Sequence, residues 1–572
     1  MVGRAFPQVT DRVHGWRFAD SGGHMARDGQ VPWPPSLMAE YTAKGYWRGV
    51  TLGSLVGEWA DRYGPRTALV DGDRRIAYTE LAALVDTVAV NLVDLGLRDG
   101  DAMLVQLQNC WEFVVTTLAA IRVGVVPVMA LPTYRERELT HLAAHVEAAA
   151  IVVPAVWRRF DYQDMALRLT DSLPHLRHVL VVGDPVSSRA IGLHGLLSAE
   201  GDAQTRGKLL DDLAPRATDV ALMLMSGGTT GLPKMIARTH NDYEYNARRS
   251  GEVSGLGPET VYLTALPVGH NFPLGSPGVL GTLMVGGRVV LLPSPEPRAA
   301  FAAIERERVT VTSAVPAVVQ RWLEYYEPGR HDLSSLELIQ VGGARLAPEV
   351  ALRVTPRLGC RLQQVFGMAE GLINYTGLDD PSDVVAETQG RPMCPDDEIR
   401  IVDDDGADVP EGLPGELLTR GPYTPRGYFR GGVHNAQSFT PDGWYRTGDV
   451  VRLHPSGNLV VEGRKKDLIN RAGEKVSAQE LEDVLYGLPW VARAAVVGVP
   501  DDEVGERVCV CVVTSSGTEP GLAEVRAEFA DRGFALYKFP ERIEFFDELP
   551  LTDIGKPDKK RLRVLLAERQ KA

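Results

Sequence analysis

Short β-branched runs alternate with amphipathic segments through much of this chain, and this alternation limits the folds open to it more than any other feature. Segments such as FAAIERERV and PEVALRVTPRL have apolar residues at helical spacing. Strands that alternate with helices predict α/β layers built on a largely parallel sheet. The strand-like runs HVLVVGD, RVVLLP, VTVTSAVP and LELIQVGGA occupy residues 178–184, 288–293, 309–316 and 336–344.

The sequence changes character twice toward its C-terminus. From about residue 395, turn residues separate short alternating strands in IRIVDDDGADVPEGLPGELLTRGP, which indicates a smaller β-rich subdomain. From about residue 467, SAQELEDVLYGLPWVARAAVVGVPD and VCVCVVT indicate a compact α+β unit. The charged stretch GRKKDLINRAGEKV separates the two and contains the predicted domain boundary. We predict an N-terminal extension or leader (1–31), a large domain (32–465) and a small C-terminal domain (466–572).

Composition narrows the class of protein. The 572 residues are 44% hydrophobic and 24% charged, which is typical of a globular chain with a sizeable core. The net charge of -14 argues against a nucleic-acid partner, because such binding needs a concentrated basic face. The most apolar window, WEFVVTTLAAIRVGVVPVMALP, is interrupted by Glu112 and Arg122, which argues against a membrane span. We expect a cytoplasmic protein.

The cysteines are scattered along the chain. They form no CxxC pair, so a zinc site or a disulfide framework is not expected. Cys509 and Cys511 alternate within ERVCVCVV, which predicts that both are strand side chains. The remaining cysteines are Cys110, Cys360 and Cys394.

The strongest local motif is MSGGTTGLPK, residues 225–234, which directly follows the apolar run DVALML. Glycines let backbone amides approach phosphate oxygens, Ser226, Thr229 and Thr230 offer hydroxyl donors, and Lys234 adds positive charge. A P-loop would require GxxxxGK followed by serine or threonine, whereas Lys234 follows proline and precedes methionine. The motif therefore predicts a polyphosphate-binding loop of another kind.

MSGGTTGLPK resembles the phosphate loop of the adenylate-forming (ANL) superfamily, which includes acyl-CoA synthetases, luciferases and nonribosomal peptide adenylation domains. Further motifs of that superfamily follow in the same order. The resemblance implies a large N-terminal domain of layered α/β subdomains with a β-rich subdomain, and a small mobile α+β C-terminal domain. The further motifs are QQVFGMAEG (363–371), YRTGDV (445–450), EGRKKDLINRAGEKV (462–476) and LPLTDIGKPDKK (549–560).

The resemblance assigns ATP, Mg²⁺ and a mobile C-terminal domain to these motifs. Glu370 would hold Mg²⁺, and Asp449 would accept hydrogen bonds from the ribose. Lys556 would be the cationic catalyst that bridges the substrate carboxylate and the α-phosphate, Lys466 the hinge, and Gly473 part of the loop presented to a pantetheine thiol. The complete ATP-binding set that it implies is Ser226, Gly227, Thr229, Thr230, Lys234, Gly343, Val365, Glu370, Asp449, Arg464 and Lys556.

Residues 268–278, VGHNFPLGSPG, are too polar and too rich in proline and glycine for a core strand, although apolar runs flank them. In the superfamily this segment lines the acyl pocket, where amino-acid-activating members usually have an aspartate for the substrate ammonium. Asn271 stands here instead, and a neutral amide does not offset that charge, so an α-amino acid is disfavoured.

LPVGHNFPLGSPGVLGTLMVGGRVVL closely resembles the stand-alone aryl-acid AMP ligases of catechol and phenolate siderophore pathways, which activate 2,3-dihydroxybenzoate or salicylate. By that resemblance, Asn271 contacts the ortho-hydroxyl and Phe272 stacks on the ring. His270 would lie beside the carboxylate and phosphates and is a predicted catalytic residue. Gly342 and Gly343 would leave a thin slot for a flat ring.

Ser276 and Ile373 do not agree on which acid is the substrate. Ser276 favours a hydrogen-bonding 3-substituent, as in dihydroxybenzoate enzymes, whereas salicylate enzymes tend to have cysteine there. Ile373 stands where dihydroxybenzoate enzymes tend to have valine and salicylate enzymes leucine. One methylene discriminates by only about 1 to 3 kcal/mol, so 6-methylsalicylate, 3-hydroxyanthranilate and 3-hydroxypicolinate also stay open.

The acyl acceptor is the last expectation. The sequence ends 16 residues after Lys556 with no carrier-domain serine motif, so we expect delivery to the phosphopantetheine of a separate aryl carrier protein. Coenzyme A is the alternative acceptor. A third reading is an ATP-binding regulatory protein that has lost the chemistry, although Lys234, Glu370, Asp449, Arg464 and Lys556 argue against it.

Overall fold

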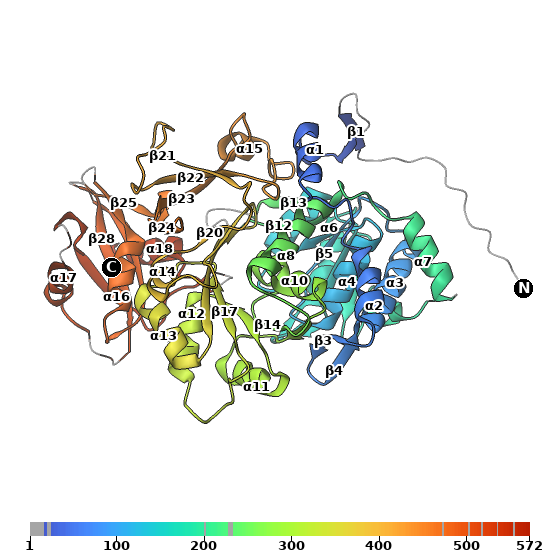
Figure 1. Cartoon of the computed structure of the whole chain (residues 1–572), viewed down its shortest axis with the longest axis horizontal. Helices are drawn as coiled ribbons and strands as arrows, with labels where there is room; N and C mark the ends of the chain where they lie inside the picture. Colours follow the sequence, from blue (N-terminus) through green and yellow to red (C-terminus); the bar gives the residue numbers. More distant parts are fainter. Residues whose placement is uncertain are drawn as a thin grey trace, which may run out of the picture.

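The computed structural model places a large body of α/β layers beside a smaller C-terminal body (Figure 1). This is the mixed architecture that the sequence predicted. Near the start, β1 (Trp16–Ala19) and β2 (His24–Arg27) form an antiparallel hairpin within the segment predicted as an extension. The structure describes residues 16–19, 24–199, 202–226, 233–471, 474–501, 504–515, 517, 519–532, 534, 536–552 and 555–571.

The first sheet is parallel except at one edge, where its last two strands are antiparallel. The predicted strand at 178–184 is β10. The strand order is β11 (Ile191–Gly192), β10 (His178–Val182), β7 (Ala150–Pro154), β5 (Ala102–Val105), β6 (Val126–Met129), β12 (Val220–Met225) and β13 (Met235–Thr239). A short separate hairpin joins β8 (Val156–Trp157) and β9 (Phe160–Asp161).

The second sheet is parallel in its centre and antiparallel at both edges. Its strands β15, β16 and β17 are the other three runs predicted from the sequence. The strand order is β20 (Arg391–Pro392), β19 (Gly371–Tyr375), β18 (Arg361–Met368), β17 (Leu338–Gly342), β16 (Val311–Ala314), β14 (Val261–Thr264), β15 (Arg288–Leu291), β3 (Thr67–Asp71) and β4 (Arg74–Ala77).

Helices cover these two sheets (Figure 1). Local sequence explains where several of them begin: Thr239 and Asp242 form a capping box at the start of α8, and proline occupies the first turn of α11, α12 and α13. The helices are α1 (Pro35–Ala43), α2 (Leu55–Tyr63), α3 (Tyr78–Asp94), α4 (Trp111–Arg122), α5 (Glu136–Val146), α6 (Tyr162–Ser172), η1 (Leu193–Leu197), α7 (Ala203–Asp212), α8 (His240–Val253), α9 (Asn271–Gly275), α10 (Gly278–Met284), α11 (Pro297–Glu307), α12 (Pro316–Tyr325), α13 (Pro348–Leu358) and α14 (Ser382–Glu387).

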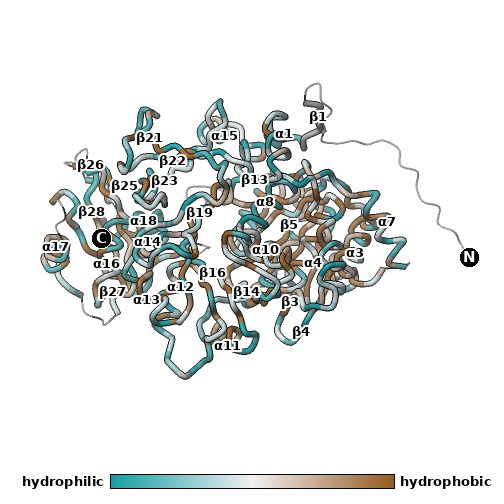
Figure 2. The backbone as a smooth tube through the Cα atoms, in the orientation of Figure 1, coloured by the Kyte–Doolittle hydropathy of each residue, from teal (hydrophilic) through white to brown (hydrophobic). Residues whose placement is uncertain are grey.

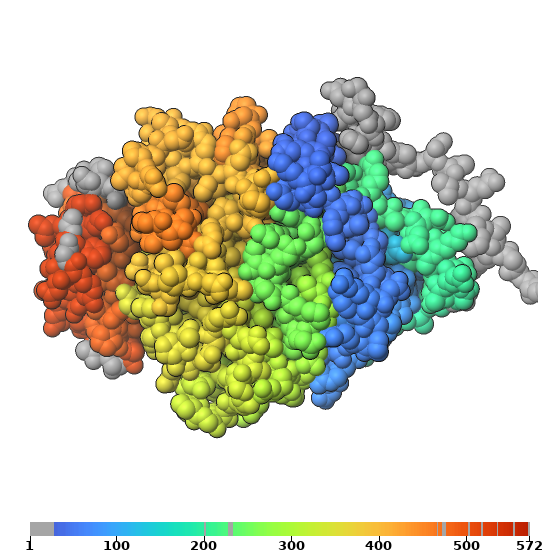
Figure 3. All heavy atoms as spheres, in the orientation of Figure 1, coloured from blue at the N-terminus to red at the C-terminus, as the bar shows by residue number. Residues whose placement is uncertain are grey.

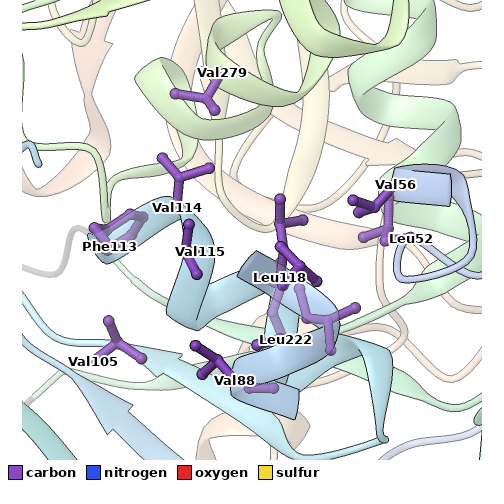
Figure 4. Packing of buried hydrophobic residues seen from close by; sticks show 14 of the residues in the cluster. Leu52, Val56, Val88, Val105, Phe113, Val114, Val115, Leu118, Leu222 and Val279 are labelled. Carbon is purple, nitrogen blue, oxygen red and sulfur yellow. The ribbon is translucent and has the colours of Figure 1, made fainter. Parts of the chain in front are cut away.

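The largest core lies between the two sheets. Apolar side chains of both sheets, such as Leu222 and Val289, belong to one cluster with helix residues. Figure 4 shows Leu222 together with Val88 of α3 and Leu118 of α4. Every residue of α4 is buried. Figure 2 shows hydrophobic residues concentrated around α4 and β5. The apolar window of the sequence is therefore a core helix followed by strand β6. In the part of the chain that the structure describes, no helix is long and apolar enough to cross a membrane.

The predicted β-rich subdomain is an antiparallel sheet. The chain then passes through η2 (Lys465–Asp467) into the C-terminal sheet. The domain boundary at residues 465–466 stays a prediction. The strands of the subdomain are β21 (Glu398–Val402), β22 (Gly415–Arg420), β23 (Tyr445–Leu453) and β24 (Leu459–Arg464), with the short helix α15 (Val433–Ser438) between β22 and β23.

The C-terminal body is a sheet with helices on both faces. Because side chains alternate along a strand, Val496 and Val510 face one core while Cys509 and Cys511 face the other, against α18. All five cysteines are free and buried. Figure 3 shows this body (red) against the large domain. Its elements are β25 (Leu468–Arg471), β26 (Glu474–Ser477), α16 (Ala478–Tyr486), β27 (Val491–Asp501), β28 (Gly505–Thr514), α17 (Leu522–Asp531), η3 (Leu536–Lys538), β29 (Arg542–Phe545) and α18 (Lys559–Lys571).

Candidate active site

A cavity lies where β17 and β18 end, against helix α9. It brings together all seven residues that the sequence predicted for acid binding: His270, Asn271, Phe272, Ser276, Gly342, Gly343 and Ile373. Their roles stay predictions, but their gathering around one space is a structural fact. The full lining is these seven with Val365, Gly367, Met368 and Ala369.

The segment VGHNFPLGSPG forms a short helix rather than an irregular loop. His270 is the residue before α9, and its Nδ1 accepts a hydrogen bond of 3.4 Å from the Phe272 amide. The first turn of a helix has amides without partners inside the helix, and this contact satisfies one of them. Ser276 ends the helix and precedes a cis proline. The polar residues of the segment are therefore held on a short rigid element.

Gly342 lines the cavity at a point where a side chain has no room. A Cβ atom on this residue would lie 2.9 Å from the Val365 carbonyl oxygen and 3.1 Å from Cε1 of the Phe272 ring. Both distances are shorter than ordinary van der Waals contact, so the ring occupies the space that a side chain would need. This geometry fits the predicted slot for a flat substrate.

Helix α8 orients two of the cavity residues from behind. The Tyr243 hydroxyl donates a 2.9 Å hydrogen bond to Oδ1 of Asn271, and Nδ2 of Asn246 lies 3.2 Å from Oγ of Ser276. Sequence reasoning missed both supporting residues. Their spacing of three within α8 places them on one face of that helix, but only the tertiary structure shows that this face meets α9.

The C-terminal domain reaches the same cavity through Lys556. Its Cε lies 3.7 Å from the position that a Cβ on Gly343 would take. Gly343 has a φ of +81°, which favours glycine. Burial, with a smaller contribution from the Lys556 charge, lowers the pKa of His270 to about 4. At neutral pH, His270 is therefore uncharged beside a cationic lysine.

Asp449 and Arg464 form a pair on adjacent strands of the β-rich subdomain. They face each other in the β23–β24 register, and Asp449 Oδ1 lies 2.8 Å from Arg464 Nε. Asp449 is only 4% exposed, and its charge raises the pKa of Arg464. The pairing orients the Asp449 carboxylate, as a ribose acceptor would require.

Tyr428 links two residues that lie far apart in the sequence. Its hydroxyl donates a 2.9 Å hydrogen bond to Oε1 of Glu370 and lies 3.3 Å from the Tyr445 hydroxyl. The Lys234 ammonium lies 4.3 Å from the centre of the same ring, a cation–π contact. The predicted phosphate lysine and the predicted metal ligand therefore meet at one tyrosine, which sequence reasoning missed.

The phosphate loop is described at its two ends. The Ser226 amide donates to the Lys234 carbonyl oxygen at 2.9 Å, and the Lys234 amide donates to Ser226 Oγ at 3.1 Å. These two hydrogen bonds continue the β12–β13 pairing past the last strand residues and hold the loop ends together. Gly227, Thr229 and Thr230 lie outside the described residues, as does Gly473; for Lys466 only the backbone in η2 is described.

Glu370 fits the needs of Mg²⁺ bound with a nucleotide. Among the described residues, no group of three or more His, Cys, Asp or Glu side chains is placed to hold a metal ion without help. Mg²⁺ usually takes one or two carboxylates and completes its octahedron with water and substrate phosphates. A buried carboxylate that shares Tyr428 with the predicted phosphate lysine, Lys234, matches that chemistry.

An ion pair joins the two domains at the back of the site. Arg345 Nη2 lies 3.2 Å from Asp483 Oδ2 of α16, and Arg345 Nη1 donates to the Val461 carbonyl oxygen at 3.1 Å. The Ser477 hydroxyl also donates to the Glu462 carbonyl oxygen. Burial raises the pKa of Asp483 to about 7, against a lowering by Arg345. These contacts hold the small domain in the orientation that brings Lys556 to the cavity.

Comparison with known proteins places this geometry in a family. The model of the AMP-binding enzyme family matches residues 56–429, and that of the AMP-binding enzyme C-terminal domain matches residues 480–556. The chain belongs to the AMP-binding enzyme family. The first matched region lies within the large body and the second within the C-terminal body.

Several relatives have names of enzymes that act on aryl acids. A salicylyl-CoA synthase / salicylate adenylyltransferase of Streptomyces sp is 57% identical over 94% of this chain and 98% of its own length. A 2,3-dihydroxybenzoate-AMP ligase of Bacillus subtilis is 47% identical (95% and 98%), and a salicyl-AMP ligase / salicyl-S-ArCP synthetase of Mycobacterium tuberculosis is 46% identical (93% and 94%). The solved Mycobacterium smegmatis MbtA apo structure superposes with a TM-score of 0.72 at 45% identity, covering 94% of this chain and 98% of that one.

Proposed function

We propose that the protein activates an ortho-hydroxylated aryl acid, such as salicylate or 2,3-dihydroxybenzoate, with ATP to give aryl-AMP and pyrophosphate. It then transfers the aryl group to the phosphopantetheine thiol of a separate aryl carrier protein, as in siderophore or other nonribosomal peptide synthesis. The observation that carries this proposal is the meeting of Lys556 from the C-terminal domain with His270, Asn271 and Gly343 around one cavity.

The first step needs fixed positive charge more than it needs a base. The acid is already ionised at neutral pH, so its carboxylate attacks the α-phosphorus directly, an O–P bond forms, and the bond to pyrophosphate breaks. Lys556 offsets the charge that accumulates on the α-phosphate. The neutral His270 borders the carboxylate end of the cavity without adding a second cation beside Lys556.

ATP would occupy the region between the cavity and the β-rich subdomain. Asp449 accepts from the ribose hydroxyls, the Val365 backbone borders adenine, and Ser226 and Lys234 bind the phosphates. Glu370 would hold Mg²⁺, which when bound offsets the charge of the departing pyrophosphate. Tyr428 keeps the Glu370 carboxylate and the Lys234 ammonium near each other through the contacts described above.

The second step requires the small domain to move. Rotation about the segment at Lys466 would withdraw Lys556 and bring the Gly473 loop to the thiol entrance. Such a rotation must break the Arg345–Asp483 pair, so this pair belongs to the adenylate-forming orientation. A surface that includes the Gly473 loop and the C-terminal domain is the docking face for the carrier protein.

Transfer to coenzyme A is a second candidate, because a relative at 57% identity carries both a CoA synthase and an adenylyltransferase name. The two acceptors share the adenylation step and differ in the thiol. Thioester formation measured with coenzyme A and with a phosphopantetheinylated aryl carrier protein separates them. Efficient coenzyme A turnover without carrier loading would refute the carrier assignment.

Acid-dependent ATP–pyrophosphate exchange tests the first half of the proposal. A panel of salicylate, 2,3-dihydroxybenzoate, 6-methylsalicylate, 3-hydroxyanthranilate and 3-hydroxypicolinate ranks the acids that the sequence leaves open. We expect exchange with at least one ortho-hydroxylated acid and none with α-amino acids. No exchange across the panel would instead favour an ATP-binding protein without chemistry.

A further inference from the structure

Tyr243 is the only residue that the described part of the chain places within hydrogen-bond distance of the Asn271 side chain. It lies on α8, has no exposed surface, and donates from its hydroxyl to Asn271 Oδ1 at 2.9 Å. A buried phenol needs an acceptor for its proton, and burial raises its pKa, so Tyr243 stays protonated and donates. The side-chain carbonyl oxygen of Asn271 therefore already accepts a hydrogen bond from Tyr243 on α8.

We propose that Tyr243 is a positioning residue that holds the Asn271 amide with its NH₂ group toward the cavity. The pocket thereby selects aryl acids that present a lone pair at the ortho position and rejects acids of the same shape that present an ortho N–H. This inference rests on the proposed function and deepens it, because it defines the substrate class by the direction of one hydrogen bond.

The Tyr243 ring is held rigidly enough to impose that direction. The Arg238 guanidinium lies 4.9 Å from the ring centre and is itself bound by Asp242 at 2.6 Å, both residues being fully buried. A Cβ on Gly275 would lie 2.7 Å from the Tyr243 hydroxyl oxygen, so glycine at this position leaves room for the hydroxyl. The amide of Asn271 cannot turn over without leaving this buried proton unpaired, which is costly.

This orientation of the Asn271 amide distinguishes between acids that present different groups at the ortho position. In a salicylate, the ortho O–H donates internally to the carboxylate, and the phenol oxygen then presents a lone pair outward. In an anthranilate, one N–H makes the same internal contact, and the second N–H points outward. The first arrangement matches the Asn271 NH₂ group; the second places two donors face to face. A ring nitrogen, as in picolinates, matches as well.

Ser276, like Asn271, accepts a hydrogen bond from a residue of α8. Asn246 Nδ2 donates to the Gly275 carbonyl oxygen and lies 3.2 Å from Ser276 Oγ, while Arg238 Nη2 lies 3.4 Å from Asn246 Oδ1. With its oxygen accepting from Asn246, the Ser276 hydroxyl has its own proton to offer to the cavity. The pocket thus presents two donors side by side, which favours a second acceptor, such as a hydroxyl oxygen, next to the ortho position.

The test compares kcat/KM for salicylate and anthranilate in the pyrophosphate exchange assay. We expect the native protein to prefer salicylate by about 10- to 100-fold, the range for leaving one buried donor unpaired. In Tyr243→Phe, Asn271 is free to turn, and the preference should fall to within about threefold. The matched control is Tyr262→Phe, which removes an equally buried hydroxyl that donates to Ser313 at 2.6 Å outside the cavity lining and should keep the native preference.

Each outcome bears on the inference. An unchanged preference in folded Tyr243→Phe, or native preference for anthranilate, would overturn it while leaving aryl-acid activation intact. Exchange with no aryl acid would overturn the proposed function together with this inference. If Tyr243→Phe does not fold, Gly275→Ala serves instead, because its methyl group displaces the hydroxyl. Ser276→Ala should lower the ratio of 2,3-dihydroxybenzoate to salicylate and leave the salicylate to anthranilate ratio unchanged.

Discussion

Gly342→Ala measures directly how tightly the acid slot is built. The added methyl group would lie 2.9 Å from the Val365 carbonyl oxygen and 3.1 Å from Phe272 Cε1, and the backbone oxygen cannot rotate away. Relief requires the Phe272 ring to shift into the cavity. Overpacking of this kind costs about 1 to 3 kcal/mol of stability. If the shifted ring also weakens binding of the acid by about 1.4 kcal/mol, the KM for the acid rises about tenfold.

The assay separates the acid from the nucleotide. Pyrophosphate exchange at varied acid and at varied ATP should show the KM rise for the acid alone, because the methyl group points at the ring of Phe272. Urea unfolding gives the stability cost. The matched control is Gly57→Ala on α2, where a Cβ meets no atom within 4 Å and a small gain in stability is expected. Unchanged acid KM with unchanged stability in Gly342→Ala would refute the slot.

Three further predictions address the cationic, titrating and metal-binding groups. Lys556→Ala should slow adenylate formation about 100- to 1,000-fold while transfer from preformed aryl-AMP stays mostly intact; equal loss in both assays would contradict the domain rotation. The pKa of His270 is lowered to about 4, so its contribution to stability is present above its unfolded pKa of 6.5 and is lost as the pH falls toward 4. Between pH 7.5 and 5.0 the native protein should lose about 2 kcal/mol more than His270→Gln in urea unfolding; the same loss in both proteins would show that His270 is not the group. Chelation by EDTA should abolish exchange and added Mg²⁺ restore it, and Glu370→Gln should raise the half-saturating Mg²⁺ concentration about tenfold; an unchanged Mg²⁺ requirement would exclude Glu370 as the ligand.

The local sequence pattern was enough to predict the layers of this fold. The β-branched runs at residues 288–293, 309–316 and 336–344 became parallel strands of one sheet, with β14 between the first two, because a strand buried on both faces needs apolar residues throughout. Cys509 and Cys511 followed the alternation of β28. The short helix α9 was not predicted, since the prolines and glycines of residues 268–278 indicate a loop, and the start of the helix depends on the His270 contact with Phe272.

The sequence by itself determined the residue types on which the chemistry depends and their order along the chain, and thereby the family, because phosphate, carboxylate and metal binding each require particular side chains. Only the tertiary structure decided how those residues are oriented. Tyr243 and Asn271 are 28 positions apart, and Tyr428 and Glu370 are 58 apart. Their hydrogen bonds exist because packing of α8 on α9, and of the β-rich subdomain on β18, brings them within 3 Å. The direction of an amide depends on such neighbours, which no local pattern encodes.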